Sequence, residues 1–237
     1  MVIIITGASR GIGFETAKYF ARMKDTEIYA LSRNKAGLGR LSTESAGLNK
    51  TSRLHTMVFD LDLFLRDPDS LTRKLQRDIK HIDILINNAG ILINKPFLQM
   101  SLEETERIFR VNFMAPAMLI RELMPLMGKK GSTHVVNISS MGGFQGSMKY
   151  PGLSIYSASK ASLACLTECL HEEFKDSGIA FNCLALGSVQ TEMLEEAFPG
   201  FKARLQPGEM AEFIGHFALT GHKQMRGKII PVSVSNP

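Results

Sequence analysis

The sequence lacks the features that define several large classes of protein. It contains no tryptophan and three cysteines in 237 residues, and no two cysteines form a CxxC pair. We therefore expect neither a disulfide framework nor a metal site, and we predict reduced thiols in a cytoplasmic protein. No apolar run approaches the ~20 residues that a membrane helix needs, and the opening MVIII lacks the basic segment of a signal peptide. We therefore predict no membrane partner.

Basic residues outnumber acidic ones in only one part of the chain. Residues 1–100 hold 15 Lys and Arg against 10 Asp and Glu, whereas residues 101–237 hold 13 against 13. A nucleic-acid surface normally shows a denser basic stripe with aromatic residues between the charges, so we expect no nucleic-acid partner. A mild excess of positive charge suits a small ligand that carries phosphate.

Short apolar runs rich in β-branched residues alternate with longer helical stretches. Such runs are typical of parallel strands that helices cover on both faces. We predict one α/β domain over residues 1–237, a doubly wound, Rossmann-type parallel sheet of about seven strands. Strands are expected at 2–6, 27–31, 53–59, 82–86, 133–139, 179–185 and 227–234, and helices near 12–24, 36–48, 67–80, 101–127, 154–177 and 208–220. Ser101 and Glu104 predict a capping box at one helix start, and Gly178 is placed to end another helix.

The stretch TGASRGIG, residues 6–13, lies between the first strand and the first helix. Glycines at such a turn let the backbone approach a pyrophosphate, and the helix N-terminus offers unpaired N–H groups. The spacing differs from GxGxxG, and glycines also serve tight turns, but the strand–turn–helix context favours a dinucleotide site. The residues expected to line it are Gly7, Ser9, Arg10, Gly11, Ile12 and Gly13.

The second strand lacks the acidic residue that NAD-binding sheets place on the adenosine ribose about 20 positions after the glycine turn. That count reaches Ser32 and Arg33, and residues 28–43 contain no acid. Arg33 and Arg10, with Lys35 beside them, are suited to a 2′-phosphate. The pattern therefore predicts NADP(H). If these cations are only solvated surface residues, NAD(H) remains the alternative.

The stretch YSASK, residues 156–160, separates a phenol and an ammonium by one helical turn. Residues i and i+4 share a helix face. A nearby ammonium, together with the positive charge of an oxidised nicotinamide, favours the phenolate and lowers the pKa of tyrosine, which is near ~10 when free. We predict that Tyr156 performs acid–base chemistry with the help of Lys160; the alternative is that both residues only decorate a helix surface.

Several motifs occur in an order and at separations that resemble the short-chain dehydrogenase/reductase family over nearly the whole chain. They are TGASRGIG, Asp60 after the third strand, NNAG at 87–90, Asn112 in RVNF, NISS at 137–140 and YSASK. The resemblance implies a Rossmann-type oxidoreductase that transfers a hydride between NADP(H) and a carbonyl or alcohol substrate.

The resemblance also assigns roles to single residues. Ser140 donates a hydrogen bond to the substrate oxygen, with Ser139 left open as the alternative, and Asn112 holds a water that links Lys160 to solvent. Lys160 also holds the nicotinamide ribose. The remaining cofactor residues are Asp60 and Leu61 at the adenine, Asn87, Ala89 and Gly90 after the fourth strand, and Gly187, Val189 and Thr191 at the nicotinamide.

The chain departs from the family pattern in three places. The segment between Ser140 and Tyr156 is a few residues longer, and Leu186 replaces the usual proline before Gly187. The end, VSVSNP, lacks the usual glycine pair, so a homodimer through helices 101–127 and 154–177 is as credible as a homotetramer.

The substrate is the least determined part of the prediction. A substrate loop is expected at about 188–208, where Met193, Leu194, Phe198 and Phe201 offer apolar contacts, and the longer segment adds Phe144, Met148 and Tyr150. These residues suggest a moderately apolar carbonyl compound. Two alternatives remain, an NAD(H)-dependent alcohol dehydrogenase and a non-catalytic dinucleotide-binding redox sensor or scaffold. An epimerase would normally need a larger C-terminal domain.

Overall fold

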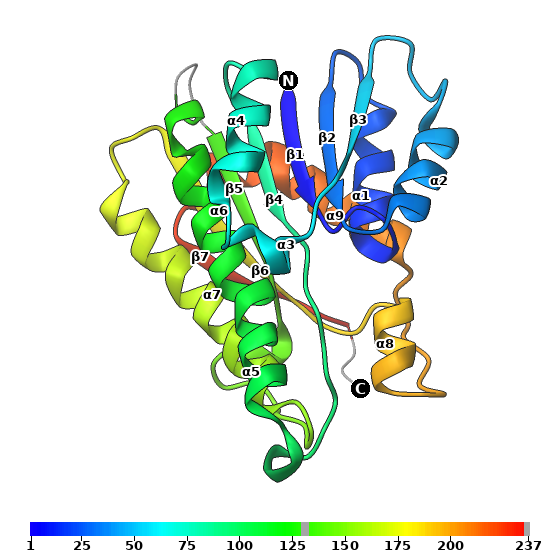
Figure 1. Cartoon of the computed structure of the whole chain (residues 1–237), viewed down its shortest axis with the longest axis vertical. Coiled ribbons are helices and arrows are strands. Elements are labelled where there is room, and N and C mark those ends of the chain that lie inside the picture. The colour runs from blue at the N-terminus through cyan, green and yellow to red at the C-terminus, as the bar shows by residue number, and fades with distance from the viewer. Residues whose placement is uncertain (129–132, 235–237) are drawn as a thin grey trace.

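The computed structural model describes residues 1–128 and 133–234, whose strands form one parallel sheet in the order β3-β2-β1-β4-β5-β6-β7 (Figure 1). The strands of this part of the chain are β1 (Val2–Thr6), β2 (Glu27–Ser32), β3 (Arg53–Val58), β4 (Ile84–Asn87), β5 (Thr133–Ser140), β6 (Ile179–Leu186) and β7 (Lys228–Val232). The predicted doubly wound sheet of seven parallel strands is confirmed.

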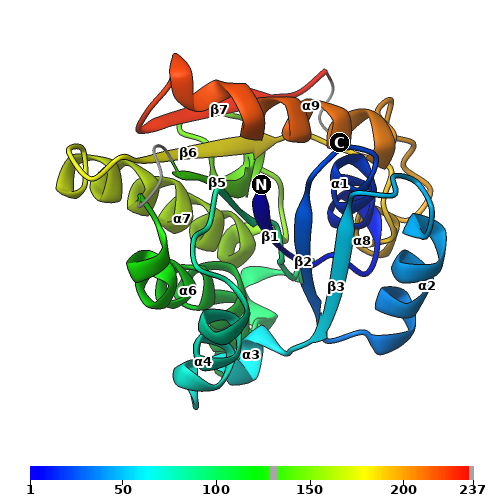
Figure 2. The ribbon, with the colours of Figure 1, turned by 90° about the horizontal axis from the view of Figure 1, so that it is seen from above.

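Helices cover both faces of the sheet, as the view from above shows (Figure 2). One layer holds α1 (Gly11–Ala21), α2 (Lys35–Ser45) and α9 (Pro207–Thr220). The other holds α4 (Pro68–Asp78), α6 (Ala115–Leu123) and α7 (Ser154–Glu173), with α5 (Leu102–Phe109) before α6. In the described ranges, no helix is long and apolar enough to cross a membrane.

The central strand β1 shows how the sequence builds this core. All its residues are buried because both faces are covered by helices. Ile3 and Ile5 face the cluster of α1 and α9, and Ile4 between them faces the cluster of α4 and α6. Full burial of one such side chain contributes about 1.5–3 kcal/mol, so the continuous apolar run fixes the sheet between two layers.

The sheet topology places the site at the carboxyl ends of the strands. Strand β1 pairs with β2 on one side and with β4 on the other. The connections after β1 and β4 therefore leave in opposite directions and open a crevice between them. The ends of β1, β4 and β5 meet at this crevice.

The long helix predicted over 101–127 is divided. The capping box of Ser101 and Glu104 is confirmed at the start of α5, but a π-helical turn at Arg110–Met114 separates α5 from α6, and a 3₁₀ turn follows at Met124–Leu126. Pro116 explains the division. It has no N–H for the carbonyl of Asn112, and its ring would clash with that carbonyl in a regular helix, so the turn widens around Asn112.

Two further boundaries differ from the prediction. Helix α7 ends at Glu173, before Gly178, which instead takes a φ of 75° just before β6. The expected loop 188–208 contains the short helix α8 (Glu192–Ala197), because the Thr191 hydroxyl accepts a hydrogen bond from the backbone N–H of Leu194 at 3.2 Å. Asp60 caps another short helix, α3 (Leu61–Phe64), which the sequence analysis did not predict.

Candidate active site

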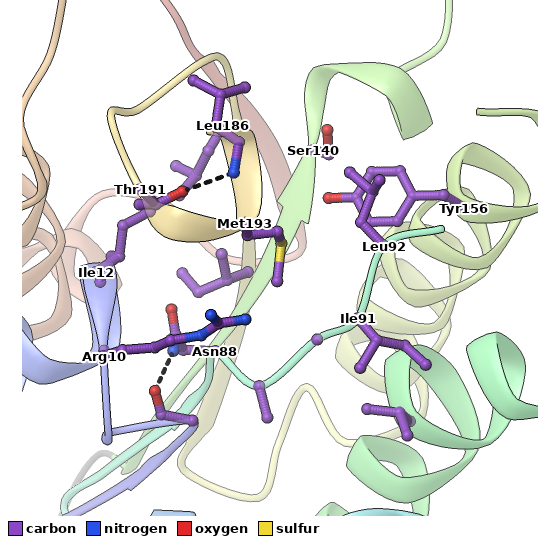
Figure 3. A pocket seen from close by; sticks show the side chains of 18 of the residues that line it. Arg10, Ile12, Asn88, Ile91, Leu92, Ser140, Tyr156, Leu186, Thr191 and Met193 are labelled. Carbon is purple, nitrogen blue, oxygen red and sulfur yellow. Dashed lines mark hydrogen bonds between the residues drawn. The ribbon is translucent and has the colours of Figure 1, made fainter. Parts of the chain in front are cut away.

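A cavity of about 660 Å³ runs along the carboxyl edge of the sheet, from the glycine turn after β1 to Tyr156 on α7 (Figure 3). It brings together most of the residues predicted from the sequence. Those that line it are Gly7, Ser9, Arg10, Gly11, Ile12, Gly13, Ser32, Arg33, Asp60, Leu61, Ala89, Gly90, Ser139, Ser140, Tyr156, Lys160, Gly187, Val189 and Thr191. Asn87 and Asn112 lie behind the wall.

The glycine turn lets the first helix open directly onto the cavity. Gly7 has a φ of 72°, and a Cβ on it would lie 2.8 Å from the Cα of Ala89. The N-cap residue of α1, Arg10, makes no side-chain capping bond, and the first turn contains no acidic residue. The N-terminal N–H groups of α1 and its positive dipole end therefore suit a phosphate.

The end of the cavity that the sequence predicts for the adenosine is formed after β2 and β3. The Ser32 hydroxyl donates to the Ser9 hydroxyl at 2.8 Å, and an Asp60 oxygen accepts from the backbone N–H of Asp62 at 3.0 Å. Arg33 is exposed and forms no ion pair with any residue in the described ranges. Arg10 is already engaged, because its guanidinium lies 2.9 Å from a carboxylate oxygen of Glu196 on α8.

Ser140, Tyr156 and Lys160 meet at the other end. In Figure 3 the Ser140 hydroxyl and the Tyr156 phenol point toward the same part of the cavity. Lys160 donates to the carbonyl of Ile138 at 2.9 Å, and its Nζ lies 6.0 Å from the centre of the Tyr156 ring. Ser139 donates to the carbonyl of Lys160 at 2.8 Å. That bond uses the Ser139 proton, whereas the Ser140 oxygen only accepts from the backbone N–H of Gly142 at 3.2 Å, so the geometry favours Ser140 as the hydroxyl that can donate to a ligand.

Burial determines the protonation of Tyr156 and Lys160 in the protein alone. Burial raises the pKa of Tyr156, and the Ser140 hydroxyl beside it opposes that rise to a smaller extent. Burial also lowers the pKa of Lys160 to about 8. The protein alone therefore does not produce the predicted lowering of the tyrosine pKa, because loss of hydration outweighs the contact with Ser140; the part of that prediction that rests on an oxidised nicotinamide stays a prediction. The phenol of Tyr156 therefore keeps its proton at neutral pH in the protein alone.

Asn112 acts on the cavity wall from behind. Its Oδ1 accepts from the backbone N–H of Ile91 at 2.8 Å, and its Nδ2 donates to the carbonyl of Ile91 at 3.0 Å and to Ser159 at 3.0 Å. The π-helical turn thus fixes the segment after β4. A Cβ on Gly90 would lie 3.2 Å from the Nζ of Lys160 and 3.4 Å from the Oδ1 of Asn112, so only glycine fits here without displacing them.

Asn87 belongs to a buried chain of amides below the cavity. Its Nδ2 donates to Asn137 at 2.8 Å, and Asn137 donates to Thr167 at 2.9 Å, which connects β4, β5 and α7. The next residue, Asn88, lines the cavity instead and donates to the carbonyl of Thr6 at 3.0 Å. Successive side chains along a strand point to opposite faces. The end of β4 therefore decides which of these two neighbouring asparagines faces the cavity.

The end of the cavity beyond Tyr156 is mainly apolar. Of the predicted contacts, Tyr150, Met193, Leu194 and Phe198 line the cavity, whereas Phe144, Met148 and Phe201 do not. Other lining residues were not predicted from the sequence: Leu92 and Ile93 after β4, Met141 after β5, and Leu153 before α7. The first two lie two and three residues after the NNAG motif, and this nearness is the signal that could have placed them here. Leu186 also lies on this wall (Figure 3).

Comparison with known proteins identifies the family. The family model described as short chain dehydrogenase matches residues 1–200. The chain belongs to this family. It is 35% identical over 194 residues to a ketoacyl reductase, HetN, of Nostoc sp., covering 81% of this chain and 64% of that protein, less than two thirds of its length. It is 34% identical over 218 residues to a fatty acyl-CoA reductase of Mycobacterium tuberculosis, covering 90% and 71% of the two chains.

Solved structures share the fold. A short chain dehydrogenase of Escherichia coli in complex with NADPH has a TM-score of 0.86 at 24% identity, covering 97% of this chain and 95% of that one. A 4-hydroxyisoleucine dehydrogenase mutant in complex with NADH and succinate has a TM-score of 0.84 at 26% identity, covering 100% of both chains. The Rossmann-type fold predicted from the motifs is thereby confirmed.

Proposed function

We propose that this chain is an oxidoreductase that transfers a hydride between NADP(H) and a carbonyl or alcohol substrate. The observation that carries the proposal is a single continuous cavity. It joins the uncapped N-terminus of α1, which suits phosphate, to the convergent side chains of Ser140 and Tyr156. A nicotinamide dinucleotide has this arrangement of groups, with phosphates in the middle and the reactive ring at one end.

The residues of the chain have separate tasks in the proposed reduction. The bound nicotinamide supplies the hydride. Ser140 donates a hydrogen bond to the carbonyl oxygen, and Tyr156 gives that oxygen its phenolic proton as negative charge develops there. Lys160, when protonated, holds the ribose and favours the phenolate left on Tyr156. Asn112 holds the backbone of Ile91 and a water on the way from Lys160 to solvent. Alcohol oxidation uses the same groups in reverse.

The proposed cofactor preference rests on Arg33. It is a free cation at the adenosine end, and no acid follows β2 within residues 28–43 to hold a ribose 2′-hydroxyl. A guanidinium there suits a 2′-phosphate. One observation supports the NAD(H) alternative: Arg10, the second cation predicted for the phosphate, is paired with Glu196.

The proposed substrate is a moderately apolar carbonyl compound, since the cavity wall beyond Tyr156 is mainly apolar. The names of the two relatives, a ketoacyl reductase and a fatty acyl-CoA reductase, agree with such a substrate. We further propose a cytoplasmic homodimer through α5, α6 and α7, or a homotetramer. A dinucleotide-binding sensor or scaffold without turnover remains the second class of function, although nothing specific in the site favours it.

Titration with NADPH and NADH in separate experiments, followed by nicotinamide fluorescence, tests the cofactor. We expect tighter binding of NADPH, and a loss of roughly tenfold in NADPH affinity in Arg33→Ala, because one charge-assisted contact contributes about 1.5–3 kcal/mol. NADH affinity should stay unchanged. Arg22→Ala, an exposed arginine outside the cavity, is the matched control. Equal affinity for both cofactors in the wild-type protein would support NAD(H) use.

A further inference from the structure

Tyr150 carries a buried hydroxyl that the proposed reaction does not use. It lies six residues before Tyr156, in the longer segment between β5 and α7, and it lines the cavity. Its hydroxyl oxygen is covered by neighbouring atoms and has no hydrogen-bond partner among the residues that the structure describes. A buried donor without a partner is unfavourable, and such groups in native proteins call for an explanation.

The backbone around Tyr150 is held in place by the rest of the segment. The carbonyl of Tyr150 accepts from the N–H of Leu153 at 3.3 Å, and Gly152, with a φ of 83°, makes the turn between them. The carbonyl of Gly152 accepts from the N–H of Lys95 at 3.0 Å, which ties the segment to the chain after β4. Earlier in the segment, Lys149 donates to the carbonyl of Phe144 at 2.7 Å. The unpaired hydroxyl is therefore not on a loose loop.

The ring of Tyr150 meets the end of α8. Its centre lies 6.5 Å from that of Phe198, with the planes at 73°. Beside this contact, Asn94 donates to the carbonyl of Ala197 at 2.7 Å. The longer segment and the α8 region thus close on each other over the apolar end of the cavity, and Tyr150 and Phe198 form the contact between them.

The apolar residues that line this end of the cavity offer neither charge nor a hydrogen-bond donor to a ligand. The wall residues Leu92, Ile93, Met141, Leu153, Leu186, Met193 and Phe198 have no side-chain N–H or O–H donor. Within this set and Tyr150 itself, the phenol is the single group able to recognise an oxygen. An uncharged acceptor suits it, because an apolar wall would leave a carboxylate without compensation.

We propose that Tyr150 selects the substrate by donating a hydrogen bond to a second, uncharged oxygen of a carbonyl compound with an apolar chain. The substrate class is a keto ester or keto thioester, with the ketone at Ser140 and Tyr156 and the ester carbonyl at Tyr150. Entry of the ligand separates Tyr150 from Phe198 and gives the hydroxyl its acceptor. This inference rests on the proposed function for the ketone end of the substrate.

The test compares Tyr150→Phe with the wild-type protein on two substrates, a medium-chain 3-keto ester and a plain ketone of equal length, with NADPH. We expect kcat/KM for the keto ester to fall roughly three- to tenfold, the effect of one neutral hydrogen bond, and kcat/KM for the ketone to stay unchanged. Tyr19→Phe, in which the changed ring packs on Gly215 outside the cavity, is the matched control. Equal losses on both substrates, or no loss on either, would overturn the proposal.

Binding of a diester to the NADPH-loaded protein, followed by nicotinamide fluorescence, separates this inference from the proposed function. The diester keeps both acceptors but has no ketone to reduce. Weaker binding by Tyr150→Phe, with no change in Tyr19→Phe, supports the role of Tyr150 even if the protein reduces none of the carbonyl compounds. Equal binding by Tyr150→Phe and the wild-type protein counts against that role, even if both proteins reduce ketones.

Discussion

At the scale of single residues, burial sets the chemistry of the site. Tyr156 and Lys160 are both removed from water, and burial shifts both pKa values toward the neutral forms. A phenol that keeps its proton is suited to give it to a developing alkoxide. This state suits the proposed direction of carbonyl reduction, and Lys160, with its pKa lowered to about 8, lies one helical turn from the phenol.

The pH dependence of reduction should report on Lys160. With its pKa at about 8, Lys160 is protonated below that pH and loses its charge above it. In the proposed mechanism the charged form of Lys160 holds the ribose and favours the phenolate of Tyr156, so kcat/KM for carbonyl reduction should fall as pH rises through about 8. In Lys160→Arg, whose guanidinium stays charged, residual activity should show no such fall between pH 6 and 10. The same profile in both proteins would contradict this role.

Local spacing is what made the reactive residues predictable. The separation of Tyr156 and Lys160 by one helical turn needs no tertiary information, and the structure brings both to the cavity. Asn87 was predicted to line the cavity but lies beneath it, because its position depends on a pairing with Asn137 across two strands. The burial of Tyr156, which raises its pKa in the protein alone, could not be predicted either, since it is set by packing of distant segments.

At the scale of elements, the segments around the cavity are less regular than the hydrophobic pattern suggests. Periodicity predicts the helices over 101–127 and 154–177, but it does not reveal the π-helical turn that directs Asn112 toward Ile91. The helix α8 was missed because a short element leaves too few residues for a period to appear. Both irregular elements adjoin the cavity, where they fix its walls.

Glu196 on helix α8 binds Arg10, a residue that the sequence predicts as a ligand of the cofactor's 2′-phosphate. Arg10 and Glu196 form an ion pair between the glycine turn and α8, and their side chains are 44% and 65% exposed. Such a pair is weak, so we expect Glu196→Gln to raise NADPH affinity by only about two- to fivefold, with NADH affinity unchanged. Glu195→Gln, at the neighbouring position on α8, is the control. Titration by nicotinamide fluorescence measures both, and a weaker affinity for NADPH in Glu196→Gln would show that the pair assists binding instead.

At the scale of the whole molecule, the sequence determined the architecture almost completely. Apolar runs that helices cover on both faces are characteristic of a parallel sheet, and the seven strands appear close to their predicted positions.

Polar side chains are also buried inside this core, and His134 is one of them. His134 on β5 is buried, with one ring nitrogen 2.8 Å from the carbonyl of Ala218 on α9 and the other 3.0 Å from Asn182 on β6.

His134 should make the fold sensitive to acid. Burial lowers its pKa to about 4 in the folded protein, whereas the unfolded chain takes up the proton near ~6.5. Between these values the unfolded state binds more protons, so stability is complete above about 6.5 and is lost as pH falls toward about 4. We expect this residue to lower the free energy of unfolding by about 2 kcal/mol from pH 7 to pH 5.

Denaturant unfolding at pH 7 and pH 5 measures this effect. In His134→Gln the difference in the free energy of unfolding between pH 7 and pH 5 should be about 2 kcal/mol smaller than in the wild-type protein. The variant itself should be less stable at pH 7. The exposed His216 provides the control substitution, His216→Gln, which should keep the wild-type difference. An unchanged difference in His134→Gln would assign the acid sensitivity to other groups.

The most direct test of the proposed function is the pair Tyr156→Phe and wild type, compared for NADPH binding and for turnover of a carbonyl substrate. The substitution removes one oxygen atom from a buried ring and leaves the cofactor part of the cavity intact. We predict unchanged NADPH affinity, by nicotinamide fluorescence, and a loss of roughly 10²–10⁴-fold in kcat, the usual contribution of general acid catalysis. Wild-type turnover in Tyr156→Phe would contradict the mechanism.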